Sequence, residues 1–369
     1  MAIDIFKEYL LPKTKVDYIG GKGKVDVAKL LNGQTLFKLS SNENILGSSP
    51  KALQAVFNTV NKLSEYPDRT DERLRNKLST FYDGELNKNQ FFINNGGTSL
   101  IDLIERAFLE PRNEIIISNP AFIPYAIFAK KWGAKVIDIP LLGDNFDLNV
   151  NGILASINDN TRLIFVTNPN NPMGTHIPKN QLDKLIDNLP EHVILVYDEV
   201  YHQYVDASNA VRAYEYVKEG KNVIGVNSFS KAYGLAGLRI GYGYSTEKIA
   251  RYIAQACTPF MINTLALEAA IAALDDVEFI NKTVALNATE KIFIYNELDN
   301  LGIQYWKTQA NFITIKPEIN DEELENAMLM EGIMVRPVAS FGAPGCVRVT
   351  IGDREANTAY LKALKKIVQ

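Results

Sequence analysis

The stretch Asn227-Ser-Phe-Ser-Lys-Ala-Tyr-Gly-Leu-Ala-Gly-Leu-Arg-Ile-Gly-Tyr-Gly-Tyr244 sets one lysine, Lys231, among small and hydroxylated residues. Ser228 and Ser230 precede this lysine, and Arg239 follows it by eight positions. A lysine held partly away from water and near other cations loses affinity for its proton, so this setting suits an amine that reacts with a carbonyl group. An exposed loop lysine is the alternative. The rest of the chain has to decide between the two.

The composition is that of an ordinary globular protein. The chain has 369 residues and a mass of 41.2 kDa, and 46% of its residues are hydrophobic, which predicts two or three domains with a large core. A formal net charge of −4 gives no basic surface, so we expect no nucleic-acid partner. The sequence starts without a signal-peptide pattern, and no stretch reaches the ~18 apolar residues of a membrane span. We therefore expect a soluble, cytoplasmic protein with no membrane partner.

Cysteine and histidine spacing predicts no metal site. The two cysteines, Cys257 and Cys346, are far apart in sequence, and they have no metal-type spacing with the three histidines. We expect neither structural zinc nor a disulfide framework.

From about residue 71 onward, helical and strand patterns alternate. Short, mainly apolar runs bounded by turn residues predict strands; they are Phe91–Ile93, Ile115–Ile117, Val136–Ile139, Leu163–Val166, Val193–Val196 and Val223–Val226. Strands that are apolar almost throughout and separated by helices favour an α/β fold with a large domain, whose mostly parallel, seven-stranded-type sheet is covered by helices on both faces. Such sheets bind ligands at the carboxyl ends of their strands.

Polar residues follow four of these predicted strands. Gly97, Thr98 and Ser99 open a helix after the first strand, where backbone N–H groups and hydroxyls favour an anion. The other three strand ends provide amides, a carboxylate with a phenol, and the lysine with an arginine: Asn168 and Asn171, Asp198 and Tyr201, Lys231 and Arg239. Pyridoxal phosphate requires a lysine, an acid beside its ring nitrogen, donors to its phenolate oxygen and a phosphate pocket. Each element alone is also typical of a turn or a cap, but their joint order predicts a pyridoxal-phosphate enzyme.

With these motifs the chain resembles the fold-type I aminotransferases, and within them the histidinol-phosphate aminotransferase branch. Ser-Phe-Ser-Lys-Ala-Tyr-Gly-Leu-Ala-Gly-Leu-Arg-Ile-Gly-Tyr at 228–242 resembles the family's Schiff-base segment. The resemblance implies that Lys231 binds pyridoxal 5'-phosphate as a Schiff base and transfers the proton. It also implies that Ser228, Ser230 and Arg239 lie near the cofactor phosphate, with Gly97, Thr98 and Ser99.

The resemblance assigns further cofactor contacts. Asn171, in Asn-Asn-Pro-Met-Gly, matches the donor to the ring hydroxyl. Asp198 and Tyr201, in Tyr-Asp-Glu-Val-Tyr, match the pyridinium partner and a second donor to that oxygen. Phe122, in Asn-Pro-Ala-Phe-Ile-Pro-Tyr, stands where the family has an aromatic ring that stacks on the cofactor. Tyr66, in Ser-Glu-Tyr-Pro-Asp, resembles the tyrosine that reaches the phosphate in the neighbouring subunit, which implies a homodimer with shared sites.

Four residues are assigned to the substrate by the same resemblance. Tyr18, in Tyr-Ile-Gly-Gly-Lys, and Asn42, in Ser-Ser-Asn-Glu-Asn-Ile-Leu-Gly, fall in segments similar to those of the branch. Arg336 and Arg348 resemble its C-terminal pair of arginines. Arg348 would bind the carboxylate of glutamate or 2-oxoglutarate, and Arg336 would help to hold a substrate phosphate. For Arg336 a strand-end surface charge is the alternative.

The implied reaction is transamination between L-histidinol phosphate and 2-oxoglutarate, in histidine biosynthesis. One departure from the branch keeps other amino donors open. Gly96-Gly-Thr-Ser99 stands where the branch usually has Gly-Ser-Asp-Glu or Gly-Ala-Asp-Glu, so two acidic residues are missing. A related aminotransferase for aromatic or other amino acids and a phosphothreonine decarboxylase-like enzyme are the alternatives. A cofactor-binding regulator without catalysis is a third reading, from a different functional class.

We expect the large domain to span residues 46–258 and to bind the cofactor. A smaller α+β domain would combine residues 1–45 with residues 259–369. In the second of these segments, a long helical pattern at 277–302 precedes short strands at Phe312–Ile315 and Val347–Ile351.

Overall fold

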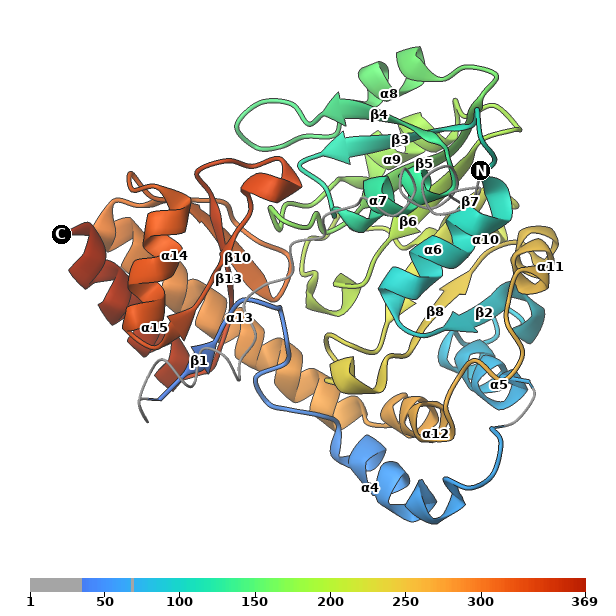
Figure 1. Cartoon of the computed structure of the whole chain (residues 1–369), viewed down its shortest axis with the longest axis horizontal. Coiled ribbons are helices and arrows are strands. Elements are labelled where there is room, and N and C mark those ends of the chain that lie inside the picture. The colour runs from blue at the N-terminus through green and yellow to red at the C-terminus, as the bar shows by residue number, and fades with distance from the viewer. Residues whose placement is uncertain (1–34, 68–69) are drawn as a thin grey trace, which may run out of the picture.

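The computed structural model describes residues 35–67 and 70–369, which form a seven-stranded, a four-stranded and a two-stranded sheet with their helices (Figure 1). Tyr18, predicted to contact the substrate, lies outside the described residues. In Figure 1 the seven-stranded sheet lies on one side of the molecule, and the smaller sheet with α14 and α15 lies on the other.

The large sheet has the strand order β2-β8-β7-β6-β5-β3-β4. Its strands are β2 (Phe91–Asn94), β3 (Glu114–Asn119), β4 (Lys135–Pro140), β5 (Thr161–Thr167), β6 (Ile194–Asp198), β7 (Val223–Ser228) and β8 (Gly241–Tyr244). Strands β3 to β7 pair in parallel, whereas β8 is antiparallel to both β2 and β7. The mostly parallel sheet is therefore confirmed. The sequence patterns did not predict β8, because two glycines interrupt its apolar alternation.

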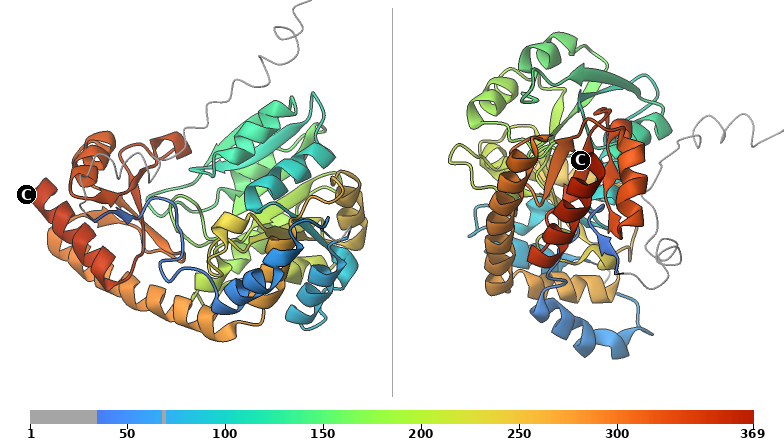
Figure 2. Two further views of the ribbon diagram at one scale, coloured as in Figure 1. Left: turned by 60° about the horizontal axis from the view of Figure 1, so that its bottom comes forward. Right: turned by 90° about the vertical axis from the view of Figure 1, so that its left-hand side faces the viewer.

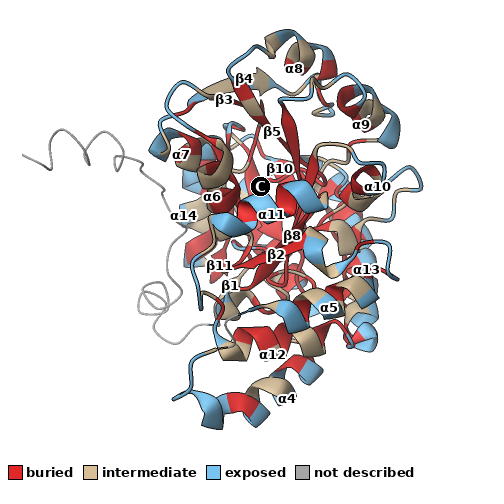
Figure 3. Cartoon of the chain, turned by 90° about the vertical axis from the view of Figure 1, so that its right-hand side faces the viewer, coloured by how far each residue is buried: buried red, intermediate tan, exposed pale blue. Residues whose placement is uncertain are grey.

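Helices cover both faces of this sheet, and the strands between them are buried (Figure 3). One face packs against α6 (Gly97–Phe108), α7 (Pro124–Lys131) and α11 (Glu247–Gln255). The core on the other face includes α4 (Pro50–Thr59), α5 (Glu72–Phe81), α8 (Val150–Ser156), α9 (Lys179–Ile186), α10 (Ala213–Lys218) and α12 (Thr264–Ala273). Short 3₁₀ turns occur at η1 (Val60–Lys62), η2 (Lys88–Gln90), η3 (His202–Tyr204), η4 (Ala236–Leu238) and η5 (Ala339–Phe341).

The smaller sheet is antiparallel and has the order β12-β13-β10-β9. Its strands are β9 (Gln304–Tyr305), β10 (Phe312–Lys316), β12 (Arg336–Pro337) and β13 (Val347–Thr350), while β1 (Phe37–Lys38) pairs in parallel with β11 (Ile333–Met334). Helices α14 (Asp321–Met330) and α15 (Arg354–Val368) pack on it. Helix α13 (Val277–Leu301) runs along both parts of the molecule in Figure 2. The domain boundaries at residues 45 and 258 stay a prediction.

Gly234 fixes the turn that follows Lys231. Its backbone has a φ of +69°, and a Cβ at this position would lie 1.9 Å from the carbonyl oxygen of Gly47. The Ser48 hydroxyl donates to the Gly234 carbonyl oxygen at 2.7 Å. Only glycine combines this backbone conformation with such a close approach, so the turn is held directly against the segment at Gly47 and Ser48.

We expect Gly234→Ala to destabilise the protein more than Gly302→Ala, a matched control at the end of α13. Gly302 also has a positive φ, of +67°, but nothing lies within 4 Å of a Cβ built on it. The control should lower the free energy of unfolding by about 1–2 kcal/mol, from backbone strain alone. Gly234→Ala adds a clash with main chain and should cost roughly 2–5 kcal/mol. Equal losses in urea denaturation would contradict this account.

Candidate active site

The carboxyl ends of β5, β6 and β7 meet at a cavity of about 460 Å³. The N-terminus of α6, the segment 40–43 and the strands β12 and β13 complete its wall. Most of the residues proposed from the sequence line this one cavity: Asn42, Gly97, Thr98, Phe122, Asn171, Asp198, Tyr201, Ser228, Ser230, Lys231, Arg239, Arg336 and Arg348. The fold thus brings together side chains that are up to 306 positions apart in sequence, from Asn42 to Arg348.

Lys231 follows β7 and is partly buried. Its Nζ donates to the carbonyl oxygen of Ser41 at 3.1 Å and lies 5.7 Å from the centre of the Tyr201 ring. Burial, with the positive charges of Arg348 and Arg239 nearby, lowers the pKa of Lys231 to about 7. A large fraction of this amine is therefore neutral at neutral pH, as a nucleophile requires.

Asp198 ends β6 and is 4% exposed. Its Oδ2 accepts from the Tyr125 hydroxyl at 2.7 Å, and its Oδ1 accepts from the Val200 N–H at 3.2 Å. Burial raises the pKa of Asp198 to about 6 in spite of these two hydrogen bonds. A carboxylate in this setting is stabilised by a cationic partner placed on its open side.

Asn171 and Tyr201 each have a hydrogen-bond donor left for a ligand. Arg348 Nη1 donates to Asn171 Oδ1 at 2.5 Å, and since a guanidinium can only donate, the oxygen of this amide must face Arg348. Asn42 Nδ2 likewise donates to the Tyr201 hydroxyl oxygen at 3.0 Å. The NH₂ group of Asn171 and the hydroxyl proton of Tyr201 are then available to one acceptor in the cavity.

Asn42 is held by the smaller sheet. Its N–H donates to Thr350 Oγ1 at 2.9 Å, and its carbonyl oxygen accepts from Asn311 Nδ2 at 3.1 Å. Its φ of +54° is a conformation that asparagine adopts more readily than most residues. The smaller sheet therefore sets the orientation of the Tyr201 hydroxyl through Asn42.

The N-terminus of α6 has the features that suit an anion. The first N–H groups of a helix have no carbonyl partner within it, and this first turn carries no acidic residue. Ser228 Oγ donates to Ser230 Oγ at 2.9 Å, and Arg239 approaches from the opposite loop. A Cβ on Gly96 would lie 2.7 Å from Arg239 Nη2, so glycine lets the guanidinium lie against the helix start. Hydroxyls, N–H groups and a cation together suit a phosphate group.

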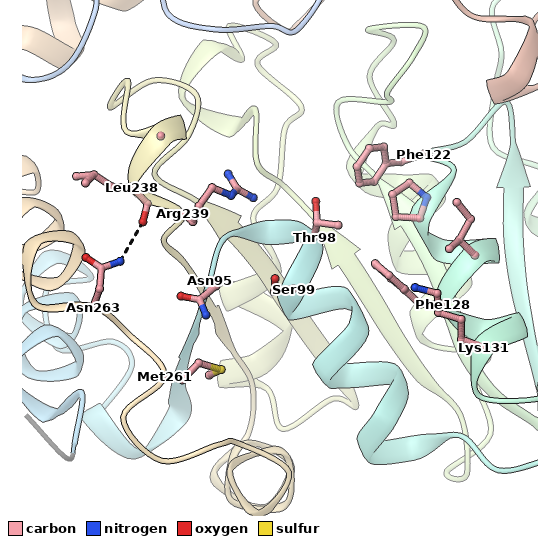
Figure 4. Close-up of a pocket in the computed structure, with 13 residues that line it drawn as sticks. Asn95, Thr98, Ser99, Phe122, Phe128, Lys131, Leu238, Arg239, Met261 and Asn263 are labelled. Carbon is pink, nitrogen blue, oxygen red and sulfur yellow. Dashed lines mark hydrogen bonds between the residues drawn. The ribbon is translucent and has the colours of Figure 1, made fainter. Parts of the chain in front are cut away.

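A second cavity, of about 880 Å³, adjoins the first (Figure 4). The two share Thr98, Phe122, Gly237 and Arg239. Ser99, predicted to contact the cofactor, lines this second cavity and not the first. In Figure 4 it lies beside Thr98 at the start of α6.

Arg336 and Arg348 stand opposite each other on β12 and β13. Both are buried, and both guanidinium groups lie within 6 Å of the Phe341 ring centre, at 5.7 and 5.5 Å. Like charges on directly paired residues repel each other. An anionic ligand bound between them removes part of this repulsion, so the pair suits anionic groups of a substrate.

Sequence reasoning missed several residues of the cavity wall. Ser41 acts through its main-chain oxygen, and Phe341 comes from a 3₁₀ turn, so neither leaves a side-chain motif. Tyr125 does not line the cavity but donates to Asp198, and it could have been found, because it follows Phe122 by three positions at the start of a helix. Tyr66 is 87% exposed, contacts the Phe260 ring and does not line the cavity of its own chain.

The described part of the chain lacks a membrane-spanning helix and a metal-binding cluster. None of the helices in residues 35–67 and 70–369 is long and apolar enough to cross a membrane. The same part of the chain has no cluster of three His, Cys, Asp or Glu side chains arranged to hold a metal ion.

Comparison with known proteins identifies relatives over almost the whole chain. The model of the family "Aminotransferase class I and II" matches residues 34–364. Histidinol-phosphate aminotransferase 1 of Idiomarina loihiensis is 36% identical over 350 residues, which are 95% of this chain and 94% of that protein. Histidinol-phosphate aminotransferase of Akkermansia muciniphila is 36% identical over 355 residues, which are 96% of each chain.

Among solved structures, histidinol-phosphate aminotransferase of Sinorhizobium meliloti in complex with pyridoxal-5'-phosphate has the same fold. Its TM-score is 0.89 at 22% identity, and the match covers 99% of this chain and 98% of that one. The histidinol-phosphate aminotransferase of Clostridium acetobutylicum gives a TM-score of 0.82 at 28% identity, over 90% and 99% of the two chains.

The raised pKa of Asp198 predicts a pH-dependent effect of Asp198→Asn in protein freed of cofactor. The group has its ordinary pKa of 3.8 when unfolded and about 6 when folded. The preference of the folded state for protonated Asp198 therefore contributes fully to the free energy of unfolding below pH 4, and this contribution is lost as the pH rises through 6. The difference between the two pKa values corresponds to about 3 kcal/mol.

Asparagine does not titrate. At pH 7.5 the Asp198→Asn variant should therefore be about 2–3 kcal/mol more stable than the wild-type protein, and at pH 4 it should have no such advantage. Urea denaturation at both pH values measures the difference. A difference that does not change with pH would show that Asp198 has no raised pKa.

Proposed function

The chain belongs to the class I and II aminotransferases, and from this premise we propose that it transfers the amino group of L-histidinol phosphate to 2-oxoglutarate. Relatives named histidinol-phosphate aminotransferase, 35–36% identical over 95–96% of the chain, support this substrate. The structural observation that carries the proposal is the pair Arg336 and Arg348, which line one cavity from adjacent strands.

The two substrates require two anion sites used in turn. L-Histidinol phosphate has a phosphate group and no carboxylate, whereas 2-oxoglutarate has a carboxylate at each end. Arg348 is bonded to Asn171 and to the Ser40 carbonyl oxygen, so it is fixed beside the ring-binding residues and would take the carboxylate next to the reacting carbon. Arg336 would take the distal anion, which is the phosphate of one substrate or the second carboxylate of the other.

Pyridoxal 5'-phosphate is the cofactor, and the residues of the cavity fit it. Asp198 would hold the ring nitrogen, and Asn171 and Tyr201 would donate to the phenolate oxygen. The α6 N-terminus, Ser228, Ser230 and Arg239 would hold the phosphate. When bound, this cofactor carries the amino group between the two half-reactions and takes up the electron pair of the substrate carbon.

The protein would supply the proton transfers and the orientation. With a pKa of about 7, the Lys231 amine can both accept the proton of the substrate carbon and return it at neutral pH. The Asp198 carboxylate would keep the ring nitrogen protonated, because a buried anion favours a positive partner. Asn171 and Tyr201, each oriented by a donor behind it, would fix the ring plane relative to Lys231.

A homodimer with shared sites is part of the proposal. Four apolar side chains are exposed on α4, on η1 and directly after it: Leu53, Phe57, Val60 and Leu63. Helix α4 lies at the lower edge of the molecule in Figure 1. Patches of this kind are typical of protein interfaces. Tyr66 follows the same segment and would reach the cofactor phosphate in the partner subunit.

We also assign the enzyme to the cytoplasm. Cys257 and Cys346 are both free thiols, as is usual in a reducing compartment, and the proposed reaction belongs to amino-acid biosynthesis.

A single-turnover screen tests the substrate. The visible absorbance band of the bound cofactor should disappear fastest with L-histidinol phosphate, compared with phenylalanine, tyrosine and phosphothreonine. Arg336→Met should slow the reaction with histidinol phosphate by roughly 30-fold or more, because about 2 kcal/mol of phosphate binding is lost. It should change the reaction with phenylalanine much less.

The control for this screen is Lys231→Ala, which lacks the reacting amine and should show no such band. A fast reaction with phenylalanine alongside none with histidinol phosphate would sink the proposed substrate while leaving the cofactor assignment intact.

Phe57→Glu tests the dimer. A buried charge in the proposed interface should convert the protein to monomers, and cofactor affinity should fall because Tyr66 of the partner is lost. Met330→Glu is a matched control, since Met330 is 73% exposed at the end of α14. This helix packs on the smaller sheet, away from α4. Analytical ultracentrifugation of the three proteins gives the masses, and a monomeric wild-type enzyme with full cofactor affinity would rule the shared site out.

A further inference from the structure

The strand ends that supply the cofactor residues also carry polar side chains on the opposite face of the sheet. Asp198 and Glu199 are consecutive, as are Asn227 and Ser228, and successive side chains of a strand point to opposite faces. Asp198 and Ser228 line the cavity. Glu199, 1% exposed, and Asn227, also 1% exposed, therefore lie beneath it, on the face where the Tyr242 ring packs.

On this face of the sheet, the Glu199 carboxylate accepts five hydrogen bonds. Its Oε1 accepts from Arg212 Nη2 at 2.9 Å, from Asn227 Nδ2 at 2.8 Å and from the Tyr244 hydroxyl. Its Oε2 accepts from Arg212 Nε at 2.9 Å and from the Ala213 N–H at 3.1 Å. The carboxylate thus joins β6 to β7, to β8 and to the start of α10.

The Arg212 guanidinium also contacts two tyrosines besides Glu199. Its Nη2 also donates to the Tyr82 hydroxyl at 2.7 Å, and that hydroxyl lies 3.1 Å from the hydroxyl of Tyr242. The guanidinium packs over the rings of Tyr82 and Tyr214, at 5.4 and 5.6 Å from their centres. Burial opposes the charge of Glu199, but this guanidinium outweighs it and holds the pKa of Glu199 below its usual value. The pair is therefore ionised.

The sequence leaves room for this arrangement. A Cβ on Gly225, the residue of β7 paired with Tyr244, would lie 2.3 Å from Cζ of the Tyr244 ring. Only a glycine lets that ring cross β7 and bring its hydroxyl to Glu199. A buried ion pair adds little net stability over apolar packing, whereas it does specify one arrangement of the groups that it joins.

We propose that Glu199 and Arg212 are positioning residues for the cofactor, which hold the ends of β6 and β7 where Asp198 and Ser228 meet the ring nitrogen and the phosphate. Glu199 directly follows Asp198, and its partner Asn227 directly precedes Ser228. A shift of Glu199 is therefore passed to both cofactor contacts through a single peptide unit on each strand. The inference depends on the cofactor alone, so it stands whether or not histidinol phosphate is the amino donor.

The test compares Glu199→Gln with Glu290→Gln. Glu290 is a matched control, because it is also a buried carboxylate bonded to an arginine and an asparagine, Arg354 and Asn357, but in the smaller part of the fold. Both variants should lower the melting temperature. Only Glu199→Gln should raise the equilibrium Kd for pyridoxal phosphate, by at least tenfold, when cofactor binding is measured by its absorbance well below the melting temperature.

If Glu199→Gln does not fold, a less disruptive variant and its control give the same test. Tyr244→Phe removes one donor to Glu199, and Tyr295→Phe removes a buried hydroxyl that accepts from the Thr308 N–H at 2.6 Å. Tyr244→Phe should raise the Kd for pyridoxal phosphate about threefold or more, and Tyr295→Phe should leave it unchanged. If the variants at 199 and 244 melt earlier but bind the cofactor as tightly as their controls, the pair is structural only and the proposal is overturned.

Discussion

The parallel alignment of β5, β6 and β7 is the constraint on which the site depends. Thr167 pairs with Asp198, and Asp198 with Val226, so β5 and β6 end at one level and β7 continues two residues further, to Ser228. Main-chain hydrogen bonds fix that level, and strand alternation then decides which side chains face the cavity. Asp198 and Ser228, at the ends of β6 and β7, are thus placed by the sheet itself. This accounts for the position of Asp198, a buried carboxylate with a raised pKa, which a flexible loop would let move towards water.

The charges of the cavity explain both its reactivity and its ligands. Among residues 35–67 and 70–369, two carboxylates, Glu43 and Asp198, line it together with Lys231, Arg239, Arg336 and Arg348. Crowded cations disfavour the protonated amine, which is one reason why the pKa of Lys231 is low. The same excess of positive charge favours dianionic ligands. One phosphate at α6 and one anion between the two arginines would bring the cavity towards neutrality, so affinity for the ligands and activation of the lysine have a common electrostatic origin.

The sequence predicted the elements whose signal is local and missed those that depend on contacts across the sheet. Apolar runs predicted the parallel strands, and the turns after them pointed to Asp198, Asn171 and Lys231 as candidate site residues, which line one cavity. Strand β8 was missed because Gly241 and Gly243 have no side chains to form an apolar pattern. Glycine is required at 243 by packing against β2, since a Cβ on Gly243 would lie 2.3 Å from the Phe92 ring. The hydrogen bonds of Glu199 could not be predicted from the sequence either, because their donors come from three other elements: Arg212, Tyr244 and Asn227.

The fold also shows what the two unusual residues at the start of α6 are next to. Thr98 and Ser99 stand where the histidinol-phosphate branch usually has Asp and Glu. Thr98 lines both cavities, and Ser99 lines only the adjoining one. Loss of two negative charges leaves the positive end of the helix dipole uncompensated, which favours an anion at this helix start. The two residues thus lie at the helix start that we propose to bind the cofactor phosphate, and both line the adjoining cavity.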